Sequence, residues 1–221
     1  MLCMLSYDSY LASIIMSIDS IFQILILLMS VVVHEVSHGY AAYLLGDPTA
    51  KNQGRLTLNP IKHLDIFGSI ILPAILILMR ANFLFGWAKP VPYNPYNFRN
   101  QRWGELIVAV AGPLSNIAIA IVFGLLIRFL LPTGLLSADA ISISASIVFI
   151  NILLAIFNLV PIPPLDGSKI LFSVLPYHMQ HIRNFLESYG FMLVLLFIFF
   201  LWPAVYPIVV FFFSLATGLG I

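Results

Sequence analysis

Long apolar runs separated by short polar loops dominate the chain. A helix needs about 20 apolar residues to cross a hydrocarbon core roughly 30 Å thick. Four runs reach that length: Ile21–Leu45, Leu106–Leu131, Ile141–Val160 and Tyr189–Ile221. The last run carries no charge, and Pro203 and Pro207 are expected to bend or divide it. The pattern predicts an all-α polytopic membrane protein with about five to six transmembrane helices.

A fifth apolar stretch, Ile66–Met79, is too short to cross. It holds 14 residues, with Pro73 at its middle and Arg80 at its end, and a second apolar piece, Ala81–Ala88, follows. Fourteen helical residues reach only about 21 Å. Such a segment fits a re-entrant hairpin, which membranes tolerate where the backbone is buried in protein or lines a cavity.

The basic residues test whether this segment spans the membrane or returns. If Ile66–Ala88 spans, the ten basic residues divide six to four between the two sides; if it returns, nine share one side and only Arg128 lies opposite. Because cytoplasmic loops are rich in Lys and Arg, the returning arrangement is favoured. It places the amino terminus outside and the loops 46–65, 89–105 and 165–188 in the cytosol. Residues 1–20 are predicted to form an interfacial amphipathic lead-in.

Composition and charge exclude several classes of protein. Hydrophobic residues make up 61% of the chain and charged residues only 9%, with a mean hydropathy of +1.04, whereas soluble domains carry about 25% charge. A net charge of +1 with no basic stripe argues against nucleic-acid binding. The single Cys3 excludes a disulfide framework and a cysteine-built zinc site. No Lys or Arg precedes the first run, so no secretory signal is expected and that run is retained.

Three ionisable residues interrupt the first apolar run: His34, Glu35 and His38, in VVVHEVSHGYAAYLL. Ionisable residues inside a span are costly and are candidate functional groups by default. Residues four apart share one face of a helix, so both imidazoles can bind one ion with Glu35 beside them. HExxH on a helix is typical of zinc metalloproteases, which use two histidine ligands and a glutamate base. The spacing therefore predicts a metal site.

A catalytic zinc needs a third protein ligand. The candidates are Asp166 and three loop histidines, which are His63, His178 and His181. Asp166 ends NLVPIPPLDG, directly after the Ile141–Val160 run, where prolines stop the helix near the membrane boundary. An isolated Asp-Gly is more often a turn or a helix cap. The position of Asp166 beside a span on the same side as HEVSH nevertheless favours it.

Together these motifs resemble the site-2 protease (M50) family of intramembrane zinc metalloproteases. The resemblance rests on HEVSH, on AGPLSN (Ala111–Asn116) and on NLVPIPPLDG in this order, and covers roughly residues 21–175. It is closest to the compact branch without PDZ or CBS domains, in which a segment like GWAKPVPYNP precedes the AGP span. The resemblance implies a single membrane-embedded protease domain over residues 1–221.

The resemblance also implies roles for individual residues. His34, His38 and Asp166 would bind one Zn²⁺ per chain near the cytosolic leaflet, between the first span and Ile141–Val160, which is the fourth span when the hairpin is counted. Glu35 would be the catalytic base. Asn158, and less directly Asn116, would lie near the substrate backbone or the oxyanion; interhelical hydrogen bonding is the alternative for both. The expected partners are the lipid bilayer and a transmembrane protein substrate, cleaved in or beside its membrane segment. The expected location is the cell membrane.

Two other functions fit an intramembrane His and Asp set. A metal-ion transporter would also bind an ion inside the membrane, but it would show several ligand sets along a path and repeat symmetry. An inactive scaffold that binds transmembrane helices would be expected to lack Glu35 or Asp166, and both are present.

Overall fold

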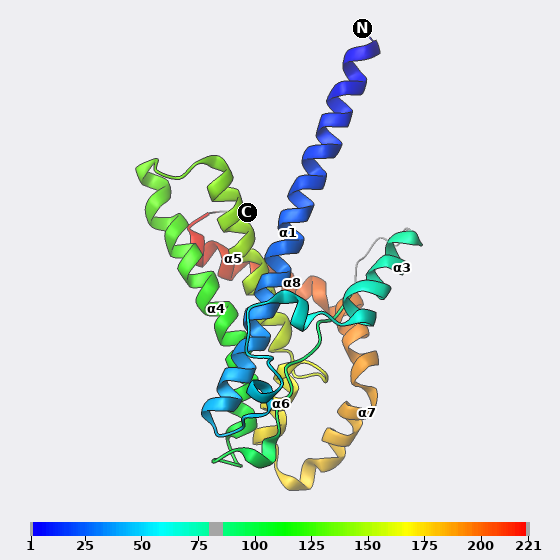
Figure 1. The fold of residues 1–221 in the computed structure, drawn as a ribbon, viewed down its shortest axis with the longest axis vertical. Helices are drawn as coiled ribbons and strands as arrows, with labels where there is room; N and C mark the ends of the chain where they lie inside the picture. The colour runs from blue at the N-terminus through cyan, green and yellow to red at the C-terminus, as the bar shows by residue number, and fades with distance from the viewer. Residues whose placement is uncertain (1, 80–85, 220–221) are drawn as a thin grey trace.

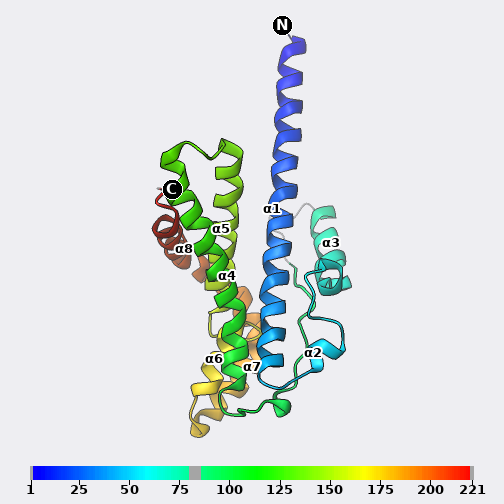
Figure 2. The same ribbon diagram turned by 60° about the vertical axis from the view of Figure 1, so that its left-hand side comes forward.

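The computed structural model describes residues 2–79 and 86–219, and the regular elements in these ranges are helices. The α-helices are α1 (Leu2–Leu44), α2 (Thr49–Asn52), α3 (Leu72–Leu78), α4 (Gly104–Leu130), α5 (Ala138–Asn158), α6 (Asp166–Val174), α7 (Gln180–Leu196) and α8 (Trp202–Thr217). Figure 1 shows α1 as an upright rod between the α4–α5 pair on one side and α3 on the other, and Figure 2 shows the same order after a turn of 60°. The predicted all-α class is confirmed.

Four helical stretches of the described residues are long and apolar enough to cross a membrane. They are Ile21–Leu44, Gly104–Thr133, Ala138–Asn158 and Gln180–Thr217. Their outer faces expose large apolar side chains, such as Ile24 at 62%, Val122 at 61% and Phe211 at 60%. Apolar surface of this extent is suited to lipid, and the chain is a multi-pass membrane protein. The count is four rather than the predicted five to six because Gln180–Thr217, although bent, is a single stretch.

The first helix extends beyond the rest of the bundle. Residues 2–20 are helical and continuous with the first span, and the amino-terminal end of α1 stands clear of the other helices in Figure 1. At about 1.5 Å per residue, its 43 residues measure about 65 Å, twice the thickness of a hydrocarbon core. The interfacial position of residues 1–20 stays a prediction.

The short segment after α2 begins with a capped turn. The Asp65 carboxylate accepts a hydrogen bond from the Gly68 backbone N–H at 2.7 Å, and so caps the π-helical turn Ile66–Ile71. The seven-residue α3 continues from this turn. The π-helical turn and α3 together cover only residues 66–78, and are therefore too short to cross a bilayer.

Trp87, beyond α3 in the chain, lies against the start of this segment. Trp87 N–H donates to the Gly68 carbonyl at 3.2 Å, and the Ser69 hydroxyl donates to the Trp87 carbonyl at 2.8 Å. A Cβ on Gly68 would lie 2.4 Å from the Trp87 ring, so this approach requires glycine. These contacts support the predicted re-entrant hairpin. The predicted turn at Arg80 and the first part of the predicted return arm, up to residue 85, lie outside the described residues.

The carboxyl-terminal run is bent, as its prolines predicted. A π-helical turn, Phe197–Leu201, separates α7 from α8, and Pro203 lies in the first turn of α8, where its missing N–H costs nothing. In Figure 1, α7 rises on the right and α8 turns across the back of the bundle. Pro207 lies inside α8 without ending the helix.

Arg128 has a structural explanation for its position opposite the other basic residues. Its guanidinium donates to the Leu215 carbonyl at 2.7 Å, one of the last carbonyls of α8, which have no partner inside the helix. Arg128 thus satisfies the end of α8 and ties it to the end of α4.

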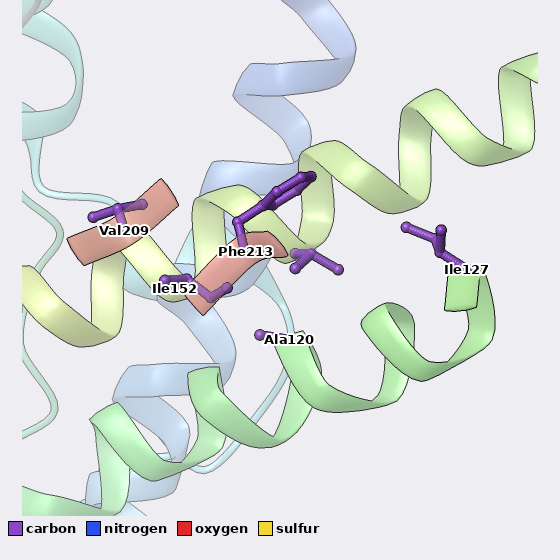
Figure 3. Close-up of a cluster of buried hydrophobic side chains, with 6 residues drawn as sticks. Ala120, Ile127, Ile152, Val209 and Phe213 are labelled. Carbon is purple, nitrogen blue, oxygen red and sulfur yellow. The ribbon is translucent and has the colours of Figure 1, made fainter. Parts of the chain in front are cut away.

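The apolar core lies where α4, α5 and α8 meet. Its buried side chains are Ala120, Ile127, Val148, Ile152, Val209 and Phe213. Figure 3 shows the labelled members pointing toward one another from the three helices. Gly124 lets α4 approach α8 closely, since a Cβ there would lie 2.8 Å from that of Ala216.

A cluster of hydrogen bonds around Asp47 holds the segment before α4 against the end of α1. The fully buried Asp47 carboxylate accepts hydrogen bonds from the Asn97 amide at 2.7 Å, the Asn94 N–H at 2.7 Å and the Thr49 hydroxyl at 2.5 Å. Burial alone would raise the pKa of Asp47, but these hydrogen bonds outweigh it and hold the pKa below its ordinary value. The extended residues 86–94 are therefore fixed beside α1.

Candidate metal centre and active site

Two histidines face each other on consecutive turns of α1. The helical spacing places the Nε2 atoms of His34 and His38 3.1 Å apart, and each residue is 5% exposed. His38 lies six positions before the end of α1 at Leu44, so it lies about 9 Å inside that end. The same end of the bundle carries α2, α6 and the start of α4 (Figure 1).

Asp166 joins this pair from the first turn of α6. Its Oδ2 lies 3.0 Å from Nε2 of His34 and 3.0 Å from Nε2 of His38. Burial alone would raise the pKa of Asp166, but the contacts with the two histidines and the charge of Lys169 outweigh burial and hold the pKa well below its ordinary value. The other oxygen, Oδ1, lies 3.3 Å from the Lys169 ammonium. One carboxylate oxygen thus faces the histidines and the other faces a cation.

Local packing explains why Asp166 points here. The prolines end α5 at Asn158, and α6 starts eight residues later. A Cβ on Gly167 would lie 2.3 Å from the Leu159 carbonyl and 2.4 Å from the Val160 carbonyl. Only glycine allows this contact between the start of α6 and the end of α5, so the glycine of the Asp-Gly pair positions the aspartate.

The remaining hydrogen bonds of the histidines determine what faces the centre. Nδ1 of His34 donates to the Asn116 Oδ1 at 2.6 Å, and Nδ1 of His38 donates to the Val108 carbonyl at 2.7 Å. With both protons on Nδ1, each Nε2 presents a lone pair. Two imidazole lone pairs and a carboxylate oxygen that converge at about 3 Å repel one another unless a cation lies between them. Two imidazole nitrogens and one carboxylate form a donor set that catalytic zinc uses, so the residues fit this metal.

Gly112 of α4 leaves the space that such an ion needs. A Cβ at this position would lie 2.5 Å from Nε2 of His38 and 2.6 Å from Nε2 of His34. Glycine in the middle of a helix costs about 1 kcal/mol relative to alanine. The space beside the two nitrogens explains why this span contains a glycine.

Gly112→Ala is expected to abolish zinc binding, because its methyl group would occupy the metal position. Gly124→Ala, also in α4, is the matched control: its methyl group would crowd Ala216 of α8, and it should lower stability without changing zinc affinity. Zinc per purified chain, measured by elemental analysis, checks both. Full zinc content in Gly112→Ala would mean that the ion lies elsewhere.

Glu35 lies beside the centre and is held by a backbone donor. Its Oε2 accepts a hydrogen bond from the Val91 N–H at 2.8 Å. The buried Arg55 holds the two residues before Val91, donating to the Lys89 carbonyl at 2.8 Å and the Pro90 carbonyl at 3.2 Å. The extended segment 86–94 therefore reaches the carboxylate of the HEVSH motif.

The two asparagines of the sequence analysis lie in different surroundings. Asn116 is fully buried and contacts His34 on the nitrogen that faces away from the centre. Its amide also donates to Asn151 at 2.8 Å. Asn158 donates to the Leu154 carbonyl of its own helix at 3.0 Å. The contact of Asn116 suits the orientation of a ligand, and the substrate role of either residue stays a prediction.

The loop histidines lie apart from this group. His63 is buried, and its Nε2 donates to the Thr57 carbonyl at 2.8 Å. His178, in the turn before α7, and His181, in the first turn of α7, are both exposed. Among the side chains that the structure describes, His34, His38 and Asp166 form the group of His, Cys, Asp or Glu residues that could hold a metal ion.

Sequence reasoning missed four residues around the site: Ser30, Arg55, Gly112 and Asn151. Ser30 and Asn151 are polar residues inside apolar runs, which is a usable signal. Arg55 lies in a polar loop and is 7% exposed only because residues distant in sequence cover it. The space beside Gly112 depends on α1 and has no sequence signal.

Comparison with known proteins agrees with the geometry of the site. The profile of the family described as Peptidase family M50 matches residues 134–201. A Bacillus subtilis protein named "Putative zinc metalloprotease YwhC" is 41% identical over 177 residues, which are 78% of this chain and 77% of that protein. A Mycolicibacterium smegmatis protein named "Putative zinc metalloprotease Rip2" is 30% identical over 76% of this chain and 62% of its own length. No solved structure matches. The chain belongs to peptidase family M50.

Proposed function

We propose that this protein is an intramembrane zinc metalloprotease that cuts peptide bonds in or beside the transmembrane segments of membrane proteins. The observation that carries the proposal is the convergence of His34, His38 and Asp166 on one point inside an apolar bundle, with Glu35 next to it. The names of the relatives in Bacillus and Mycolicibacterium support zinc as the metal. One ion per chain fits the single donor group of the described residues.

Individual residues of the chain have separate roles in hydrolysis. Bound there, zinc supplies Lewis acidity, which polarises a carbonyl and lowers the pKa of water toward 7. Glu35 accepts a proton from the attacking water and passes it to the leaving amine. The Val91 N–H orients the Glu35 carboxylate for both transfers.

Access of a peptide backbone to the site requires local unwinding of the substrate. A transmembrane helix uses its carbonyls in internal hydrogen bonds. The extended segment 86–94 beside Glu35, together with the irregular stretch 159–165 before Asp166, offers backbone partners to an unwound substrate strand.

The active site faces the cytosol in this proposal. The contacts of Gly68 and Ser69 with Trp87 support a segment Ile66–Ala88 that enters and leaves the membrane on one side. That course would leave the basic loops at the end of the bundle nearest the histidines, and Arg128 at the other end. The positive-inside rule assigns that basic end to the cytosolic side of the cell membrane.

The test is cleavage of reporter helices by the protein in liposomes. The reporters are single-span peptides with a dye at each end, in a helix-stable version and a version with Gly and Pro inside the span. The reconstituted protein should cut the second version faster, lose activity to a zinc chelator and regain it with Zn²⁺. Mass spectrometry should map the cut to the span or its border. Cuts confined to soluble tails, or cleavage unaffected by the chelator, would overturn the proposal.

A further inference from the structure

A chain of side-chain hydrogen bonds connects His34 to two other helices. Ser30 lies one turn before His34 in α1, Asn116 is in α4 and Asn151 is in α5. All are at least 95% buried, with Asn116 and Asn151 at 0% exposure. Polar residues at this depth are costly unless every hydrogen-bonding group has a partner.

The hydrogen bonds can be followed from a fixed acceptor. The Asn151 amide nitrogen lies 2.8 Å from the Ile147 carbonyl and 2.9 Å from the Ser30 hydroxyl. A backbone carbonyl can only accept, so the nitrogen of Asn151 must face it and Oδ1 must face the opposite way. That Oδ1 accepts from the Asn116 amide nitrogen at 2.8 Å.

The orientation of Asn116 then fixes the ring of His34. The Asn116 nitrogen donates to Asn151 Oδ1 at 2.8 Å and, at the longer distance of 3.4 Å, to the Ser30 carbonyl. Asn116 therefore presents Oδ1 to Nδ1 of His34 at 2.6 Å. Nδ1 must therefore carry the proton, which leaves the Nε2 lone pair directed at Asp166 and His38. If Asn116 were reversed, its N–H would require an acceptor on Nδ1, and the proton of the neutral ring would move to Nε2, where it blocks the metal.

We infer that Asn151, through Asn116, is a positioning residue that selects the metal-binding tautomer of His34. No side chain is needed to select the tautomer of His38, since its Nδ1 donates to the Val108 backbone carbonyl. The inference rests on the proposed zinc site, and it makes α5 part of a site to which it contributes no ligand.

The first variants test zinc affinity rather than activity. Asn151→Ala removes the nearer of the two acceptors of the Asn116 amide and leaves only the Ser30 carbonyl at 3.4 Å. It should lower the chelator concentration needed to remove half of the zinc by roughly 10-fold or more, as loss of a partner of a ligand typically does. Val148→Ala is the control: it opens a cavity in the buried core of the same helix, and should reduce stability but not zinc affinity. Asn151→Ser is the fallback if Asn151→Ala does not fold. Its hydroxyl can still donate to the Ile147 carbonyl but is too short to reach Asn116, so the same zinc loss is expected.

A rescue variant separates orientation from general damage. Asn116→Asp presents only acceptor oxygens, so it fixes the His34 tautomer without Asn151, and should restore zinc affinity in the Asn151→Ala background. Cobalt-loaded protein should show an altered visible spectrum in Asn151→Ala and recovery in the double variant. Unchanged zinc affinity in folded Asn151→Ala or Asn151→Ser, or an equal loss in Val148→Ala, overturns the inference. Wild-type protein that binds zinc but cuts no reporter would instead refute the proposed protease and leave this inference standing.

Discussion

Glu35→Gln is expected to abolish cleavage while zinc stays bound. The glutamine is nearly isosteric, and its side-chain oxygen can still accept the Val91 N–H that Glu35 accepts at 2.8 Å. It cannot take a proton from water, and general acid–base catalysis typically contributes about 10²–10⁴-fold in rate. Cleavage of the helix-destabilised reporter should fall by roughly that factor, and elemental analysis should find the zinc content of the wild type.

Glu187→Gln is the matched control. Glu187 is exposed on α7 and forms an ion pair with Arg183 at 2.8 Å, so both the zinc content and the cleavage rate should stay unchanged. Undiminished cleavage by Glu35→Gln would remove this residue from the chemistry. Loss of zinc in Glu35→Gln would assign it a structural role at the metal instead. A scaffold that only binds transmembrane helices would be insensitive to the change.

Asp166→Ala is expected to empty the metal site. Two imidazoles remain, but the ion loses its only anionic ligand among the described residues of the group, in a setting where burial penalises an uncompensated charge. Loss of a direct ligand should exceed the roughly 10–100-fold that loss of an outer partner costs in metal affinity. Zinc per chain should drop from about one to near zero at chelator concentrations that leave the wild type loaded, and cleavage should be lost with it.

The control for this variant is Asp139→Ala. Asp139 is exposed in the first turn of α5, and its removal should leave zinc in place. Zinc retained in Asp166→Ala would mean that another group completes the site, and the same measurement on His63→Ala and His178→Ala would identify it. Size-exclusion profiles matching that of the wild type would confirm that lost zinc does not reflect an unfolded chain.

Local signals in the sequence predicted the spans well. Apolar runs located α1, α4, α5 and the bent α7–α8 stretch to within a few residues at most helix ends, because length and hydrophobicity alone decide whether a helix can cross a bilayer. The short Ile66–Met79 run predicted the hairpin for the same reason, and the contact between Gly68 and Trp87 agrees with it. The course of the uncharged tail was harder to predict from the sequence, since Pro203 indicates a break but not the direction of the helix after it.

The candidate site was predictable in part. Helical periodicity brings His34 and His38 to one face, so a single helix already implies two converging nitrogens. Asp166 is 128 residues from His38, and its position beside a span end, together with the resemblance between motifs, favoured it over the loop histidines. Asn116 was a weaker candidate for the substrate region, with interhelical hydrogen bonding as the alternative, and its amide forms such bonds with His34 and Asn151.

What the sequence by itself determined is therefore what depends on neighbours along the chain: the helices, their membrane character, the His pair and the family. Tertiary structure alone decided what depends on packing between helices. It brought Asp166 to the histidines through the contact of Gly167 with the end of α5, left room beside them at Gly112, and buried Arg55 against the segment that holds Glu35. It also joined Ser30, Asn116 and Asn151 into one hydrogen-bonded chain. The physical reason is that hydrophobicity acts on every residue independently of its partners, whereas a hydrogen bond or a close contact requires two particular groups to meet.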